Sequence, residues 1–153
     1  MELLAGMMGL YSGYLNLNRE QLENDVVVED ESMDLHMLKQ KFSVCKVTEL
    51  DPELLKKEFV FVGNTDQELS LICESSLVPD TYLALDEGWD CFRIAEDASF
   101  SKYGMIAFLA DIIASLKTSI LVVGTYDTDY ILVKQEKMPA VVEALKENHC
   151  RFI

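Results

Sequence analysis

The stretch MIAFLADIIASLKTSILVVGTYDTDYILVKQEKMPAVVEAL, residues 105–145, holds the clearest structural pattern in the chain. Its first part places apolar residues at positions 105, 106, 108, 109, 112, 113 and 116, which form a broad helical stripe. Two β-branched runs follow and predict strands on either side of GTYDTDY. The last part has Met138, Val141, Val142 and Leu145 at i, i+3, i+4 and i+7. The stretch therefore predicts helix, strand, strand, helix.

The ends of the second helix also carry signals. Pro139 suits a first helical turn, and Asn148 is expected to close the helix in a left-handed conformation. WDCFRIA before the stretch and CRFI after it predict one further strand each. Residues 88–153 thus follow the order strand, helix, strand, strand, helix, strand. This is the ferredoxin-like βαββαβ plan of the α+β class, with an antiparallel sheet and its helices on one face.

Residues 42–87 repeat this order in reduced form. KFSVCKVT alternates apolar and polar residues like a half-buried strand, and DPELLKKE predicts a short helix with Asp51 as its N-cap and Pro52 at its first position. FVFVGNT and ELSLICE predict two strands joined by a turn. SSLVPDTYLALDEG, broken by Pro79 and Gly88, is expected to be irregular. We therefore expect two ferredoxin-like units in tandem, the first of them reduced.

Residues 1–41 differ from the rest. An apolar start, MELLAGMMGLYSGYLNL, precedes the acidic run REQLENDVVVEDESMD, which has no steady period. A docked extension and a partly disordered arm both fit this composition. The start carries Glu2 and no early Lys or Arg, unlike a secretory signal. Its apolar run is interrupted well before the roughly 20 residues that a membrane span needs.

Charge and composition exclude several classes of function. The chain of 153 residues has 13 Lys and Arg against 27 Asp and Glu, a net charge of −14. Nucleic acid and anionic membranes would be repelled by this field. Four dispersed cysteines and two histidines are poor material for a zinc site, and free thiols fit the cytoplasm. No G-x-S-x-G, P-loop or G-x-G-x-x-G motif occurs, so we expect neither an enzyme nor a cofactor.

Three segments carry a resemblance to a known family: ELSLICESSLVP, GWDCFRIAEDASFSKYGMIAFLADIIASL and VVGTYDTDYILVKQEKMPAVVEAL. Over roughly residues 42–153 the chain resembles the ACT-domain family. More narrowly, it is similar to small proteins that pair two such domains, like modules of the cytosolic arginine sensor. The resemblance implies regulation without catalysis, by binding of small molecules, most often amino acids, where two domains meet. The contact elements that it implies are residues 99–106 and 122–129.

Physical chemistry assigns roles to these two segments. A helix start offers unpaired N–H groups to a ligand carboxylate, Gly104 lacks a Cβ, and Lys102 could add a positive charge. Asp127 and Asp129 would accept hydrogen bonds from a ligand ammonium group. The predicted ligand-binding residues are Ser99, Ser101, Lys102, Tyr103, Gly104, Met105, Thr125, Tyr126, Asp127, Thr128 and Asp129.

Structural roles compete with each of these assignments. Asp127 to Asp129 also suit an ordinary turn, and Ser99 or Ser101 a plain N-cap. Gly104 could instead allow close packing of helix on sheet. Tyr126, Tyr130 and Trp89 are expected to be packing residues, and Lys102 a solvated charge.

Two functions follow from the sequence. The first is a cytoplasmic amino-acid sensor, expected to be a homodimer that signals to a protein partner. The alternative is an interaction module with a vestigial site, which acts by protein docking through residues 1–41.

Overall fold

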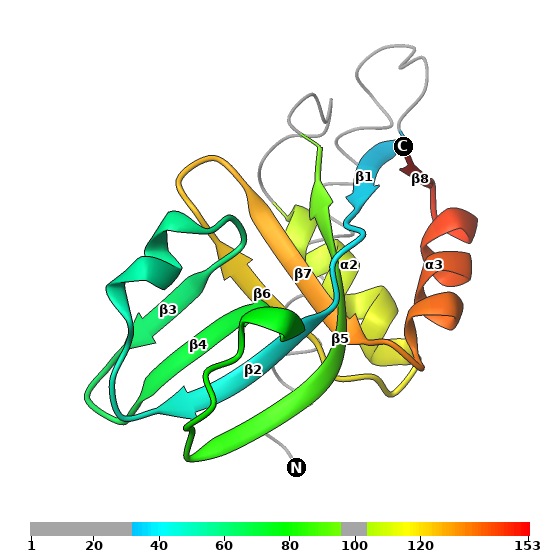
Figure 1. Cartoon of the computed structure of the whole chain (residues 1–153). Coiled ribbons are helices and arrows are strands. Elements are labelled where there is room, and N and C mark those ends of the chain that lie inside the picture. The colour runs from blue at the N-terminus through cyan, green and yellow to red at the C-terminus, as the bar shows by residue number, and fades with distance from the viewer. Residues whose placement is uncertain (1–31, 96–103) are drawn as a thin grey trace.

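The computed structural model describes residues 32–95 and 104–153. Eight strands, two α-helices and two short 3-10 helices occur in this part of the chain (Figure 1). In chain order they are β1 (Met33–Met37), β2 (Phe42–Val47), η1 (Pro52–Lys56), β3 (Phe61–Asn64), β4 (Leu69–Glu74), η2 (Ser75–Leu77), β5 (Ala84–Ile94), α2 (Met105–Ser115), β6 (Leu121–Gly124), β7 (Asp129–Lys134), α3 (Met138–Glu147) and β8 (Cys150–Phe152).

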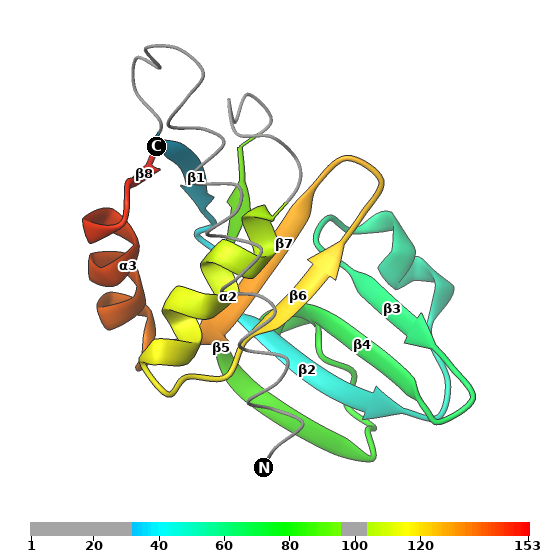
Figure 2. The same ribbon diagram turned by 180° about the vertical axis from the view of Figure 1, so that it is seen from behind.

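The C-terminal half has the predicted βαββαβ order, from β5 through α2, β6, β7 and α3 to β8. Its strands lie side by side as β6-β7-β5-β1-β8. Both helices cover one face of these strands (Figure 2). The α+β fold with ferredoxin-like units is therefore confirmed. The expectation of a purely antiparallel sheet is wrong, because β1 pairs with β8 in parallel.

The first unit repeats this strand order as β3-β4-β2-β5, with the two 3-10 helices in place of α-helices. Asp51 caps η1 as predicted: its carboxylate accepts a hydrogen bond from the Glu53 N–H at 3.0 Å. β5 belongs to both units, since its first half pairs with β2 and its second half with β7. The two units therefore share one continuous strand.

The prediction of irregular structure up to residue 88 is wrong for its last part. Residues 84–88 belong to β5. Gly88 has φ +80°, and the register with β2 changes between the pairs Phe42–Trp89 and Val44–Asp86. A β-bulge therefore sits where the sequence suggested a break, because glycine adopts positive φ without steric cost.

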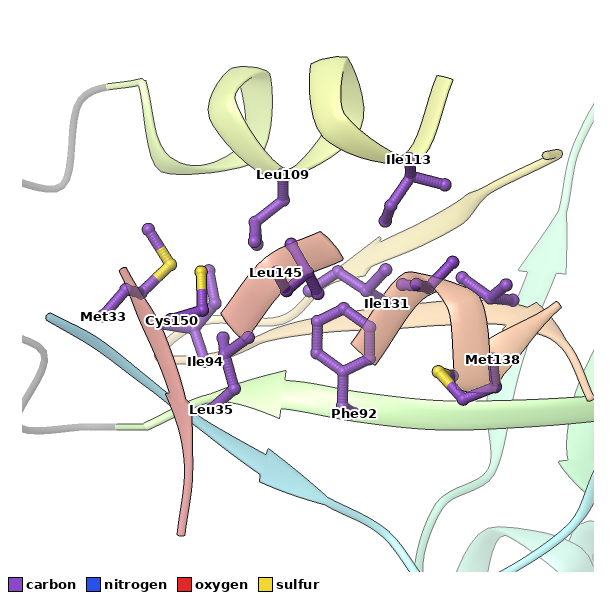
Figure 3. Close-up of a cluster of buried hydrophobic side chains, with 12 residues drawn as sticks. Met33, Leu35, Phe92, Ile94, Leu109, Ile113, Ile131, Met138, Leu145 and Cys150 are labelled. Atoms are coloured by element: carbon purple, nitrogen blue, oxygen red, sulfur yellow. The ribbon is translucent and has the colours of Figure 1, made fainter. Parts of the chain in front are cut away.

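The main core lies between the helices and the sheet of the second unit (Figure 3). Leu109 and Ile113 of α2 and Leu145 of α3 are fully buried against Phe92 of β5 and Ile131 of β7. The apolar residues whose spacing predicted both helices thus form the face that each helix packs against the core. Each of these side chains contributes about 1.5–3 kcal/mol by leaving water.

A second cluster joins the two units. Phe42 of β2, Trp89 and Cys91 of β5, and Leu132 of β7 are its buried members. Phe61 of β3 packs against it with other half-buried side chains of both units. The first unit therefore covers the sheet face that α2 and α3 leave free. A third cluster, Cys45, Val47, Leu71 and Cys73, lies on the other side of β2 and β4.

The region expected to be an extension ends in a strand of the sheet. β1 inserts between β5 and β8, where Met33 and Leu35 are buried in the main core. Arg151 of β8 donates hydrogen bonds to both carboxylate oxygens of Asp34, at 2.8 and 2.9 Å. The second unit thus contains a strand from the region before residue 42.

The left-handed residue that follows α3 is one position later than predicted. Asn148 has φ −112°, and it is His149 that has the left-handed φ of 64°. Pro139 lies in the first turn, as predicted. The helix therefore stops one residue later than the position of Asn148 suggested.

Candidate functional site

Four of the predicted ligand-binding residues, Ser99, Ser101, Lys102 and Tyr103, lie outside the described residues. The other seven lie on two elements. Gly104 and Met105 start α2, and Thr125 to Asp129 connect β6 to β7. Both elements lie toward the same end of the second unit (Figure 2).

The β6–β7 connection is a tight turn held by one threonine. The Thr125 N–H and hydroxyl both donate to the Thr128 carbonyl, at 2.8 and 3.0 Å. Thr65 makes the same two bonds to the Glu68 carbonyl in the β3–β4 turn, at 2.9 and 3.2 Å. The turn interpretation of this stretch is confirmed, and the repeat of the two units extends to their hairpins. Ligand contact here remains a prediction.

The two tyrosines of this stretch have different surroundings. Tyr130 packs as predicted, with its ring centroid 5.1 Å from Phe61 and 6.3 Å from Phe59. Tyr126 is fully exposed, so its prediction as a packing residue is wrong. It lies at the tip of the turn, beyond the strand residues that alternate into the core.

Alternation along β7 separates Thr128 from Asp129. Ile131 and Val133 point into the helix-covered core, so Asp129 lies on the same face as α2. Tyr130 and Leu132 point toward the first unit, and Thr128 lies on their side. Asp127 is exposed at the turn. The predicted residues therefore divide between two opposite faces of the sheet.

Gly104 is the N-cap of α2, with φ +83° and no side-chain capping bond. A Cβ on Gly104 would meet no atom of residues 32–95 and 104–153 within 4 Å, so packing of α2 on the strands of this part of the chain does not require a glycine. Its positive φ explains the residue instead. The N-cap expected at Ser99 or Ser101 is corrected to Gly104. The helix start carries no acidic residue in its first turn, which leaves it open to an anion.

An open depression of about 390 Å³ lies on the opposite face, between the two units. Glu58 and Phe59 of the first unit and Arg93, Thr128 and Tyr130 of the second line it. Of these, only Thr128 was predicted. The one signal in the sequence was Arg93, a charged residue within the otherwise apolar run of residues 91–95.

Trp89 is buried in the cluster between the units, as predicted. The Lys134 ammonium lies 4.8 Å from the centre of its ring and is also paired with Asp86. The tryptophan therefore holds the shared strand to β7 rather than offering an open stacking surface.

No cluster of three or more His, Cys, Asp or Glu side chains that could hold a metal occurs in residues 32–95 and 104–153. Burial raises the pKa of Cys73 and Cys150 to about 11 and that of Cys91 to about 12. These thiols are protonated at neutral pH and are poor nucleophiles. The helices of the same ranges are all too short or too polar to cross a membrane.

Residues 84–147 match the family model of the ACT domain. This part of the chain is therefore an ACT domain, as the resemblance in the sequence implied. The matched region begins with β5 and ends with α3, and so contains both elements of the predicted ligand site. No curated protein matches the chain.

Solved structures share the fold over most of the chain. A protein of Agobacterium tumefaciens is 23% identical with a TM-score of 0.72, covering 80% of this chain and 92% of that one. A protein of unknown function from Vibrio cholerae is 21% identical with a TM-score of 0.62, covering 76% and 90%. The aspartate kinase of Clostridium acetobutylicum, described as an allosteric enzyme, is 9% identical with a TM-score of 0.55. It is covered over 36% of its length and this chain over 81%.

Proposed function

We propose that this protein is a non-catalytic regulatory protein that binds a free amino acid at the start of α2 and the β6–β7 hairpin. Its place would be the cytoplasm, where four reduced thiols fit the redox conditions. Bound ligand would favour one conformation of the protein, which acts as a homodimer on a protein partner. The ACT domain over residues 84–147 supports this class of function.

One observation carries the choice of site. Asp129 lies on the helix-covered face of β7, at the end of the unit where α2 begins at Gly104. The helix start suits a carboxylate, and Asp129 suits an ammonium group. A free amino acid carries both groups on one carbon, so a donor and an acceptor on one face match its backbone. Its side chain would then set specificity.

The test is thermal unfolding of the purified protein with each free amino acid at millimolar concentration. A ligand at 100 times its dissociation constant stabilises a protein by about 2.7 kcal/mol, which raises Tm by several degrees. We expect one amino acid to raise Tm in its L form and not in its D form. If every amino acid changed Tm by the same amount, or none changed it, the result would contradict an amino-acid sensor and favour the interaction module.

Variants locate the site. We expect Asp129→Asn to weaken the ligand by about tenfold to a hundredfold, because it removes the charge that a buried ammonium group needs. Asp127→Asn tests the exposed neighbour. Asp66→Asn, in the equivalent turn of the first unit, is the matched control, since it makes the same charge change away from α2. A ligand shift that survives Asp129→Asn unchanged would contradict this placement.

A further inference from the structure

We infer that the outer face of the first unit is a docking surface for a basic amphipathic helix of a partner protein. The outer face is the side of β2, β3, β4 and the start of β5 that lies away from the second unit. Its centre is the buried cluster of Cys45, Val47, Leu71 and Cys73. The cluster between the units separates this face from α2 and from the amino-acid site proposed above. Docking here is therefore independent of a bound amino acid.

Two rows of apolar side chains cross the outer face. Strand pairing places four of them side by side in the first row: Val62, Leu71, Cys45 and Leu85. The second row runs from Leu69 through Val47 to Leu83, whose N–H donates to the Lys46 carbonyl at 2.7 Å. The middle of the rows is buried, but Val62 at one end is 39% exposed and Leu83 at the other is 62% exposed. The apolar face is therefore wider than the segments that cover it.

These covering segments are short, whereas the second unit has two α-helices in the same place. η1 has five residues and η2 three, against eleven in α2 and ten in α3. Leu54 of η1 and Leu77 of η2 pack on the buried cluster, but Leu55 next to Leu54 is 61% exposed. Of the seven large apolar side chains that are exposed in the described residues, four lie on this face or at its rim: Leu55, Val62, Tyr82 and Leu83. Exposed apolar side chains that gather in this way mark an interaction surface.

The form of the occupant follows from the missing layer. A sheet buries its apolar face against a second layer, and in the second unit that layer consists of amphipathic helices. An amphipathic helix from another protein, with apolar residues at i, i+3, i+4 and i+7, supplies the same layer to the first unit.

The charge of the rim selects among possible occupants. Its exposed charged residues are mostly acidic: Glu49, Asp51, Glu53 and Asp80 against Lys56 and Lys57. Lys56 is already paired with Glu53 at 3.0 Å, which leaves an excess of carboxylates. A second copy would bring the same acidic rim, and residues 18–31 of this chain hold six acidic residues against one arginine. Both would be repelled, whereas lysines and arginines beside an apolar stripe would be attracted.

Three model peptides test this class of partner. The probe is a peptide of leucine and lysine, about four helical turns long, whose leucines form one helical face. One control alternates the same residues, as a strand would, and the other carries glutamate in place of lysine. In calorimetric titration of the full-length protein we expect the probe to bind at least about tenfold more tightly than either control. Equal affinity for the probe and a control, or absence of binding of the probe, would overturn the inference.

Neutral substitutions locate the surface without changing the charge. Leu83→Ser and Leu55→Ser are each expected to weaken the probe by about fivefold to tenfold, because a leucine that leaves water in the complex is replaced by a polar residue. Ile153→Ser is the matched control, since Ile153 is 60% exposed and follows β8 in the second unit. Unchanged circular dichroism checks that the variants fold. A loss of affinity in the control equal to that of Leu83→Ser would overturn the location.

A change of charge tests the rim. Asp80→Asn is expected to weaken the probe by about twofold, and the difference should disappear at high salt. Glu147→Gln at the end of α3 removes a charge from an exposed side chain away from the face and is the matched control. Equal losses from both variants would show general attraction to an acidic protein and would contradict the role of the rim.

Light scattering separates a partner from a second copy. We expect the natural protein and Leu83→Ser to have the same mass in solution. A lower mass for Leu83→Ser would assign the outer face to a homodimer contact and overturn the inference. Failure of the amino-acid titrations leaves this surface unaffected: if the probe binds here and no amino acid raises Tm, the docking surface stands and the sensor function is wrong.

Discussion

Three non-glycine residues of the described ranges have a left-handed backbone conformation. Two of them end helices, and the third, Phe59, lines the depression. Lys117 and His149 follow α2 and α3, where a residue of positive φ commonly ends a helix. Phe59 ends no α-helix, and its ring contributes to the depression. At the two helix ends the left-handed conformation has a steric cost in folding free energy, which a glycine would remove. At Phe59 the same change would also remove the aromatic ring.

His149→Gly is expected to stabilise the protein by about 0.5–1 kcal/mol. The side chain is exposed, and glycine avoids the steric cost of φ 64° while adding some entropy to the unfolded chain. The measurement is urea unfolding of both proteins. Asn148→Gly is the control, since Asn148 has negative φ and its side chain donates to the Ala144 carbonyl at 2.7 Å. We expect that variant to be less stable, and equal gains from both would contradict the explanation.

At the scale of elements, β1 is held in the sheet mainly by its two neighbours. Its backbone pairs with β5 on one side and β8 on the other, and Asp34 forms a two-bond ion pair with Arg151. The hydrogen bond from Arg151 lowers the pKa of Asp34 below its ordinary value, with the arginine charge acting in the same direction. The carboxylate therefore favours the folded protein only while it is ionised.

This linkage predicts a pH dependence. Because the folded pKa of Asp34 is depressed, its contribution is present above the unfolded pKa of about 4 and is lost as pH falls through the folded value. We expect Asp34→Asn to be less stable than the natural protein at pH 7, with the difference shrinking below about pH 4. Urea unfolding between pH 7 and pH 2.5 measures it. Arg151→Gln should show the same shrinking difference, and a gap independent of pH would contradict the assignment.

Local patterns predicted the second unit well, and the exceptions have a common cause. Helical periodicity gave α2 and α3, and β-branched runs around a polar turn gave β6 and β7. β1 was missed because its pairing with β5 and β8 is set by partners more than 50 residues away. The start of β5 was missed because Gly88 is typical of loops and here serves a bulge. Pairing between residues distant in the sequence produces no local hydrophobic periodicity from which the strand could be predicted.

The same limit applies to the sites. The β6–β7 turn was found because its residues are contiguous, and Thr125 holds it as turn chemistry requires. The depression was not found, because Glu58 and Phe59 meet Arg93 only through the packing of one unit on the other. Their positions follow from the pairing of both units with the shared strand β5, which no local pattern contains.

At the scale of the molecule, three apolar clusters lie in successive layers, and each contains at least one cysteine. Cys150 lies in the core under the helices, Cys91 in the cluster between the units, and Cys45 with Cys73 on the outer side of the first unit. All four thiols are free and buried. A buried thiol reacts only when the structure around it opens. The reaction rate of each cysteine therefore reports how often its own cluster opens.

Burial raises the pKa of all four thiols, so the folded protein should react with a disulfide reagent at neutral pH only through opening. In variants that keep one cysteine and replace the others by alanine, we expect Cys150 to react fastest. β8 is a three-residue strand at the edge of the sheet, whereas Cys91 lies in the central strand shared by both units. Mass spectrometry of timed labelling measures each rate, and unfolded protein in urea is the control, with four equal rates expected. If Cys91 reacted as fast as Cys150 in the folded protein, the layer between the units would open independently, and the shared strand would not join them into one cooperative structure.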